Sequence, residues 1–539
     1  MTQEHDRKKP DKSLLLCCGI FTVYAVLTLI GAANHELWFD EAQAWNIARD
    51  NDIKGIFQQL GYEGHPPLWY LILYIPARMG LSCEVIPFIS WSITAAAGAL
   101  VLFKAPFNLI TRSALLFSGG FLYINSVMSR VYCLINLFAV LIAVLYPHRK
   151  RFPVLYGVLI ALLANTHVFM CGFIGILGIF MLIDLFKDFK AKSAKQKTKE
   201  LIGLAAAGIG VLMLVLPLLN SLSLNNSTSQ HTISFADVLL GFVNSFTNIS
   251  YSIVSYGHQI GSAMEINLLE YLLGLLTAAS IIAMMILVRH KTRPFLVLLV
   301  YWFFYTVVSE IIWVTIPNRA LIFALMLFVT AWIAEYEPSG NKAGARDKNA
   351  PKADTRLLKK LLGLVMRADK NYKKSYIVLM TAVLLFSIPA AARYLFEDYV
   401  KPFCPSKLTA EFIKEELPAD SVFVTDNELL PQVLAYLPDR KFYALDFGRF
   451  YTYDTNESLD KADEADYEHI FKDLKDCEDL YYIYAHTYPD YDFISDDQNE
   501  VFLVSGGLAY GINVRCVRIV DFTLEPGNGF WFIDKLIDS

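Results

Sequence analysis

Residues 14–33 read LLLCCGIFTVYAVLTLIGAA, a run of about 20 residues without a charge. A helix of that length is just long enough to cross the hydrocarbon core of a bilayer. The run is longer than the roughly 7–15 apolar residues of a signal peptide, so we expect it to remain as a membrane anchor. Basic residues at 7–12 precede it, and such flanks favour the cytoplasmic side. The N-terminus is therefore predicted to be cytoplasmic.

Further apolar runs follow along the chain. Hydrophobic residues make up 55% of the sequence, and the mean hydropathy is +0.40. A soluble domain is nearer to roughly 45–50% apolar. The pattern is typical of a polytopic α-helical membrane protein and, with the anchor, predicts about 11 transmembrane helices. The further runs lie at about 85–103, 114–128, 131–146, 153–170, 171–186, 201–220, 262–288, 294–314, 318–334 and 376–395.

Lysine and arginine cluster in a few loops, which are therefore predicted to be cytoplasmic. These loops are 148–151, 187–199, 289–293 and 341–374. Alternating sides from them places the first loop, at 34–65, and the tail after residue 395 outside. We predict a membrane domain at 1–395 and an extracytoplasmic domain at 396–539. Segment 66–81 has about 16 apolar residues, near the lower limit for a span, and the sequence leaves open whether it crosses.

The tail has a different character, because short β-rich runs alternate with helical stretches. Such alternation predicts a small α/β domain. Strands are expected at 421–425, 441–445, 480–484 and 514–520, and helices at 427–436 and 465–474. No glycine-rich phosphate-binding loop opens any of these helices, so nothing indicates nucleotide binding, and no nucleic-acid partner is expected.

The first loop carries the candidate acids. Asp40 and Glu41 are adjacent, and Glu63 and His65 follow about twenty residues later, just before the apolar run opened by Pro66. A carboxylate beside a low-dielectric surface gains basicity and can act as a general base. A solvated loop with no chemical role is the alternative.

Three further residues lie on the same predicted side. Arg130 lies between two apolar runs, His167 ends one, and Arg319 opens another. An arginine at membrane depth is a site candidate, although it can also snorkel to the interface. A lone histidine is more often structural, and Arg319 could equally be an interface anchor. Together, the acids could deprotonate an acceptor hydroxyl while the arginines hold a lipid-linked phosphate.

These pieces together resemble the GT-C glycosyltransferases, specifically the family-39 branch related to protein O-mannosyltransferases and aminoarabinose transferases. The pieces cover roughly the first 330 residues and are Phe39-Asp40-Glu41-Ala42, Gly64-His65-Pro66-Pro67-Leu68-Trp69-Tyr70, Ser129-Arg130-Val131-Tyr132, Thr166-His167 and Pro317-Asn318-Arg319.

The resemblance implies a hexosyltransferase of the cell membrane that depends on a polyprenyl-phosphate-sugar donor. It implies that Asp40 is the catalytic base with Glu41 beside it. The substrate-binding residues would be Glu63, His65, Arg130, His167 and Arg319.

The sequence departs from these relatives at Arg319, because Pro317-Asn318-Arg319-Ala320 stands where they commonly have Pro-Arg-Tyr. The acceptor could be a glycan, a lipid or a protein, but the tail does not resemble the sugar-binding repeats of the protein mannosyltransferases. The eight cysteines have no metal-ligand spacing, and the use of a divalent cation is left open. A transporter or flippase for lipid-linked glycans is the main alternative, and a membrane scaffold is the third. A transporter would more often place ionisable residues at mid-membrane, within paired repeats.

Overall fold

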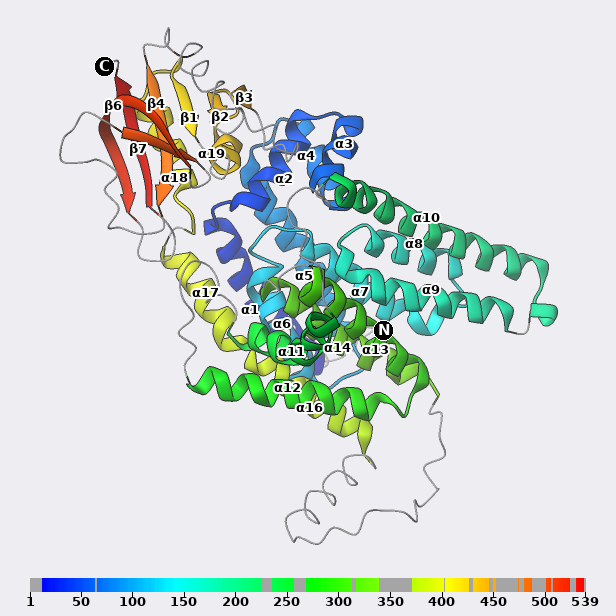
Figure 1. The fold of residues 1–539 in the computed structure, drawn as a ribbon. Helices are drawn as coiled ribbons and strands as arrows, with labels where there is room; N and C mark the ends of the chain where they lie inside the picture. The colour runs from blue at the N-terminus through cyan, green and yellow to red at the C-terminus, as the bar shows by residue number, and fades with distance from the viewer. Residues whose placement is uncertain are drawn as a thin grey trace, which may run out of the picture.

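A helical bundle carries a mixed β-sheet at one end, as the computed structural model shows (Figure 1). It describes residues 12–63, 65–187, 189–224, 235–255, 268–312, 317–338, 371–401, 403–425, 430–444, 449–451, 474, 479–486, 501–505, 508–523 and 530–537.

Within those ranges, eight helical segments are long and apolar enough to cross a membrane. The polytopic helical membrane architecture is thereby confirmed. The segments are built on α1 (Lys12–Asn34), α5 (Ile86–Lys104), α9 (Cys171–Phe186), α10 (Ala194–Leu224), α12 (Leu268–Val288), α13 (Thr292–Thr306), α14 (Pro317–Tyr336) and α16 (Tyr372–Phe386) continued by α17 (Ile388–Val400). Two shorter apolar segments are built on α7 (Tyr132–Leu145) and α8 (Pro153–Ala164). The expected number of about 11 spans stays a prediction.

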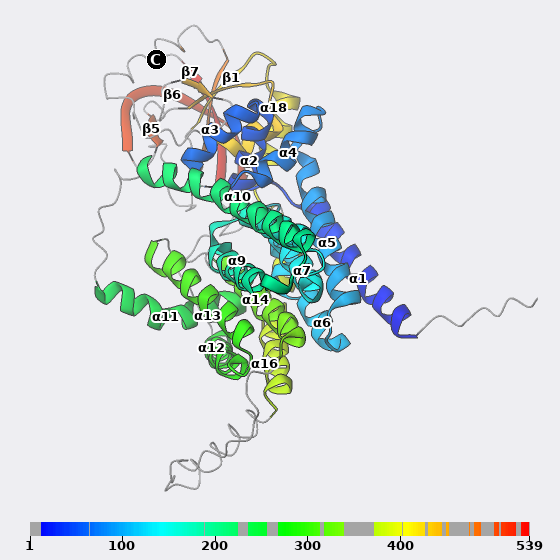
Figure 2. The same cartoon turned by 90° about the vertical axis from the view of Figure 1, so that its right-hand side faces the viewer.

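The first loop folds into short helices at one end of the bundle, beside the sheet (Figure 2). They are α2 (Phe39–Asp50) and α3 (Ile53–Glu63), and α4 (Leu68–Arg78) follows them. Helix α4 lies in segment 66–81 and has only 11 residues. At a rise of about 1.5 Å per residue it is roughly 16 Å long, about half the thickness of the hydrocarbon core. Gly80 then turns the chain with a φ of 75°, a conformation that glycine adopts without strain.

The run expected at 114–128 is not one continuous helix. Helix α6 (Leu109–Leu116) is followed by a π-helical turn over Gly120–Ile124. The break leaves the carbonyl of Asn125 outside a regular helix, where the hydroxyls of Ser90 and Thr94 on α5 donate to it. Broken helices in membranes need such side-chain donors, because lipid offers none. The break leads directly into the segment that carries Arg130.

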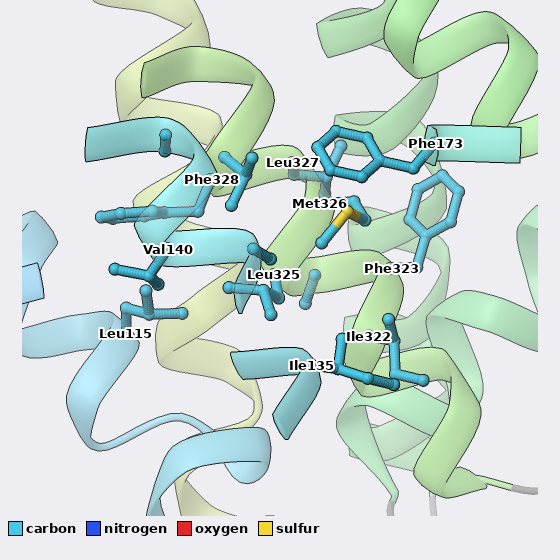
Figure 3. Packing of buried hydrophobic residues seen from close by; sticks show 14 of the residues in the cluster. Leu115, Ile135, Val140, Phe173, Ile322, Phe323, Leu325, Met326, Leu327 and Phe328 are labelled. Atoms are coloured by element: carbon cyan, nitrogen blue, oxygen red, sulfur yellow. The ribbon is translucent and has the colours of Figure 1, made fainter. Parts of the chain in front are cut away.

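Helix α14 forms the centre of the bundle. All its side chains from Ala320 to Val329 are buried, as expected for a helix that is apolar on every face. Figure 3 shows Ile322, Phe323 and their neighbours packed among side chains of other helices, including Ile135 of α7 and Phe173 of α9. The start of α14 carries Arg319, so this central helix fixes where that residue lies.

A network of ion pairs joins several helix ends. Asp184, near the end of α9, accepts from Arg293 Nη2 at 2.6 Å and from Arg149 Nε at 3.2 Å. Glu337 accepts from Arg149 Nη2 at 3.1 Å and from the Tyr146 hydroxyl at 2.7 Å. The network therefore gathers residues that lie in or beside the loops predicted to be cytoplasmic.

Replacing Asp184 by Ala is expected to lower the stability of the folded protein by roughly 1–3 kcal/mol, because two largely buried guanidinium groups then lose their shared carboxylate. Thermal unfolding in detergent measures this loss. Lys373→Ala is the matched control, since its ion pair with Glu335 has a lysine that is 61% exposed and should contribute little. Equal melting temperatures for the two variants would contradict the structural role of the network.

The described strands form one seven-stranded sheet in the order β3-β2-β1-β4-β7-β6-β5. Strand β1 (Val422–Thr425) pairs in parallel with β2 (Lys441–Ala444) and β4 (Leu480–His486). The remaining pairings are antiparallel and involve β3 (Arg449–Tyr451), β5 (Val501–Ser505), β6 (Leu508–Thr523) and β7 (Phe530–Ile537).

Strands thus lie at the four expected positions. Helices α18 (Ser406–Glu416) and α19 (Leu430–Tyr436) accompany the sheet, and α19 corresponds to the helix expected at 427–436. The helix expected at 465–474 lies, apart from Leu474, outside the described residues. That the C-terminal part forms a separate extracytoplasmic domain stays a prediction.

Helix α19 packs directly on α2. Asn46 Nδ2 donates to the carbonyl of Pro431 at 2.9 Å, and the backbone N–H of Leu37 donates to the Tyr436 hydroxyl at 2.9 Å. Trp45 and Leu434 belong to one buried apolar cluster. The helix that carries Asp40 is therefore held by the membrane part and the C-terminal part together.

Candidate functional site

A pocket lies where α2, the start of α4 and the segment around Arg130 meet. Four of the residues singled out from the sequence line it together. The complete lining is Asp40, Gln43, Ala44, Glu63, His65, Pro66, Trp69, Tyr70, Arg130, Val131 and Thr166. Segments separated by up to 126 residues of chain therefore contribute to one small cavity.

An ion pair between Asp40 and Arg130 is the main feature of the pocket. Arg130 Nη2 lies 2.6 Å from Asp40 Oδ2, and the two side chains are 12% and 35% exposed, respectively. The guanidinium carbon lies 5.7 Å from the ring centroid of Trp38 and 5.3 Å from that of Tyr132, so cation–π contacts add to the pairing. Burial alone would lower the pKa of Arg130, but the Asp40 carboxylate raises that pKa above its ordinary value. The guanidinium is therefore charged.

Gln43 and Tyr70 also line the pocket, and neither was given a role from the sequence. Gln43 follows Asp40 by three positions, which places both on one face of α2, and its Nε2 donates to Glu63 Oε1 at 3.1 Å. Recognising a helix that begins at Phe39 would have indicated Gln43. Tyr70 adds a neutral phenol, because burial, and then the negative charge of Glu63, raises the pKa of the hydroxyl well above its usual range.

His65 lines the pocket, and His167 lies next to it, outside the lining. The ring centroids of His65 and His167 are 5.8 Å apart. Burial and the nearby charge of Arg130 lower the pKa of His65 to about 4, and burial lowers the pKa of His167 well below its usual value. Both rings are therefore neutral at pH 7.

His167 also has an unused donor. Its Nδ1 accepts from the backbone N–H of Phe169 at 3.3 Å, so in the neutral ring the proton lies on Nε2. That Nε2 is buried and has no hydrogen-bond partner in the described part of the chain. A buried N–H without a partner is unfavourable, and a bound ligand could accept its hydrogen bond.

Arg319 lies behind the histidines and does not line the pocket. Its guanidinium carbon is 5.4 Å from the ring centroid of Phe169, and that ring stacks on His167 at 5.1 Å. Arg319 was expected to bind substrate; it lies beside Phe169, outside the pocket lining, and its binding role stays a prediction.

Glu41 is placed differently from Asp40, although the two are adjacent in sequence. Its side chain is fully buried and is not part of the pocket lining. It accepts from the backbone N–H of Trp38 at 2.7 Å, which caps the start of α2, and from the backbone N–H of Ser129. His35 Nε2 lies 3.1 Å from its Oε2. The expected direct catalytic role of Glu41 stays a prediction that this geometry does not favour.

Among the described residues, no group of three or more histidine, cysteine, aspartate or glutamate side chains is arranged to hold a metal ion. In comparisons with known proteins, the chain matches no family model and no curated protein. The site's own geometry therefore has to support any functional conclusion.

Proposed function

We propose that the protein is a membrane glycosyltransferase. It would move a sugar from a polyprenyl-phosphate-linked donor to an acceptor hydroxyl on the extracytoplasmic side of the cell membrane. The observation that supports this most directly is the pairing of a partly exposed carboxylate, Asp40, with a buried guanidinium, Arg130, in one pocket. In the proposed reaction, Arg130 is the cation that binds the donor phosphate, and Asp40 is the base that deprotonates the acceptor hydroxyl.

In this mechanism, Arg130 binds the lipid phosphate through its planar fork of N–H donors. Asp40 takes the proton of the acceptor hydroxyl as the new glycosidic bond forms. The bond between the anomeric carbon and the phosphate oxygen breaks, and its electron pair leaves with the phosphate. Arg130 stabilises the negative charge that develops there, in a transition state resembling an oxocarbenium ion.

The ion pair has to open before the reaction. While Arg130 is paired with the Asp40 carboxylate, neither group is free to meet a substrate. A donor phosphate that draws Arg130 away would leave the carboxylate free to take the acceptor's proton. This order, donor first and acceptor second, activates the base only when a sugar is ready to be transferred.

The other polar groups around the pair would orient the two substrates. His167 has a buried N–H without a partner among the described residues, which could donate to a phosphate oxygen or a sugar hydroxyl. Gln43, Glu63 and Tyr70 offer the mixed donors and acceptors that sugar hydroxyls use.

No step of this mechanism requires a divalent cation. Transfer activity measured in the presence of EDTA would check this.

The direct test uses membranes that contain the protein and a radiolabelled sugar on a polyprenyl phosphate. We expect label to pass into endogenous acceptors, and membranes without the protein to show none of this transfer. Incorporation that does not depend on the lipid-linked sugar would contradict the proposal. Movement of the labelled lipid between leaflets without transfer would instead favour a flippase.

The proposed side of the membrane has its own test. Helices α7, α9 and α14 each begin near the site, at Tyr132, Cys171 and Pro317, and end near the ion network of Asp184. A reporter fused after residue 395 should read as extracytoplasmic, and one fused in the basic loop at 148–151 should read as cytoplasmic. Two fusions that report the same side would overturn the placement of the site.

A further inference from the structure

A buried cluster of charges lies next to the pocket, and its members come from distant parts of the chain. His35 Nδ1 lies 2.9 Å from Asp398 Oδ2, and His35 Nε2 lies 3.1 Å from Glu41 Oε2. All three side chains are essentially inaccessible to solvent, at 0–1% exposure. We call Glu41, His35 and Asp398 the buried clamp.

The histidine of the buried clamp is charged. Burial alone would lower the pKa of His35, but the carboxylates of Asp398 and Glu41 raise it well above its ordinary value. A doubly protonated ring has two N–H donors on opposite edges, so it can donate to both carboxylates at once. The hydroxyl of Tyr123 gives Asp398 Oδ2 a second donor at 3.2 Å.

Glu41 connects the clamp to both members of the pocket ion pair. It is the residue after Asp40, and it caps α2 by accepting from Trp38 N. It also accepts from the backbone N–H of Ser129, the residue before Arg130. One carboxylate therefore fixes the two backbone segments that have to present Asp40 and Arg130 to each other.

The clamp also holds the chain that leads to the C-terminal sheet. Asp398 lies near the end of α17, and the ring of Phe403 lies 5.0 Å from that of His35. The backbone N–H of Phe403 donates to Glu36 Oε2 at 2.7 Å. Residues 35 and 36 thus fix the exit from α17, at the end of that helix that Figure 1 shows pointing toward the sheet.

We propose that Glu41, His35 and Asp398 are positioning residues, which hold Asp40 and Arg130 in register and make that geometry depend on the helix leading to the C-terminal part. This inference rests on the proposed function, in which Asp40 and Arg130 meet the substrates. It gives Glu41 a role through its neighbours in place of direct contact with the acceptor.

The experiment compares full-length protein with its His35→Gln variant in detergent, using decaprenyl phosphate as the probe. Glutamine has a single amide nitrogen and cannot donate to both carboxylates from opposite edges. We expect the dissociation constant to rise by about tenfold to a hundredfold, since a misplaced Arg130 would lose its charge-assisted hydrogen bond to the phosphate. Amide hydrogen exchange should become faster at 39–44 and 127–131. Asp398→Asn keeps an acceptor for His35 and should give a smaller change.

Asp184→Asn is the matched control, because its carboxylate is also largely buried but lies in the ion network at the other end of α9. It should lower the melting temperature without changing the dissociation constant. A His35→Gln variant that loses only thermal stability, with wild-type binding and exchange at 39–44, would overturn the positioning role. If the wild type does not bind decaprenyl phosphate, the proposed function fails. The exchange measurement alone then decides whether the clamp orders α2.

Discussion

Replacing Asp40 by Asn is expected to lower sugar transfer by roughly 10²–10⁴-fold, the usual contribution of a positioned general base. Asparagine keeps the shape of the side chain and an oxygen acceptor, but it cannot take a proton at neutral pH. Asp40 is 35% exposed, and its described partner is Arg130 at the pocket edge. The variant should therefore fold and insert normally.

The assay is transfer of radiolabelled sugar from polyprenyl phosphate, in membranes with matched protein levels. Asp50→Asn is a close control, because Asp50 lies on the same helix and pairs with Arg49 at 2.7 Å, yet it does not line the pocket. Near-wild-type transfer by Asp40→Asn, or an equal loss in Asp50→Asn, would exclude Asp40 as the base.

Glu41→Gln should reduce the stability of the folded protein more than Asp40→Asn does, because Glu41 is fully buried against a charged histidine.

Much of the membrane architecture could be predicted from the sequence, because lipid imposes a simple rule. A helix must be apolar for about 20 residues to cross, and α1, α9 and α12 follow this plainly. Segment 66–81 was ambiguous, because a run of about 16 apolar residues fits either a short span or a partly buried helix. In the folded chain the segment holds an 11-residue helix ended by a glycine turn, and whether it crosses the membrane stays open.

The pocket was partly predictable for a related reason. Asp40, His65, Arg130 and His167 all lie at ends of apolar runs on one predicted side, so alternation of the spans already brought them to a common surface. Their pairing was not predictable, because it depends on helix packing. His35 and Asp398 were missed altogether. Their contact joins residues 363 positions apart, and an acid near the end of an apolar helix has no distinguishing pattern in one sequence.

The C-terminal strands could be predicted from β-rich runs, but the packing of the C-terminal part against the membrane part could not. Nothing in Leu430–Tyr436 as a sequence indicates that this helix packs against α2. Asn46 and Trp45 do not line the pocket; Asn46 donates to the Pro431 carbonyl of α19, and Trp45 belongs to the same buried cluster as Leu434. Helix α2 thus has one face that lines the pocket and another that holds the C-terminal part.

Replacing Arg130 by Ala is expected to weaken donor binding by about 1.5–3 kcal/mol, the contribution of a hydrogen bond to a charged group, or roughly tenfold to more than a hundredfold. Arg130→Lys should recover only part of this loss, because an ammonium group lacks the planar fork. Binding of decaprenyl phosphate measures the effect directly. Arg393→Ala is the control, since Arg393 is 57% exposed and pairs with Glu397 on α17.

The two pocket variants together separate a donor site from an ordinary structural ion pair. Both should lose transfer, but only Arg130→Ala should weaken donor binding. Asp40→Asn removes the competitor for the Arg130 guanidinium, so decaprenyl phosphate should bind at least as tightly as in the wild type. Arg130→Ala removes the cation itself, so binding should weaken. If the pair only stabilised the fold, both variants would change binding in the same direction. Unchanged binding in Arg130→Ala would move the phosphate contact to Arg319, the other guanidinium near His167.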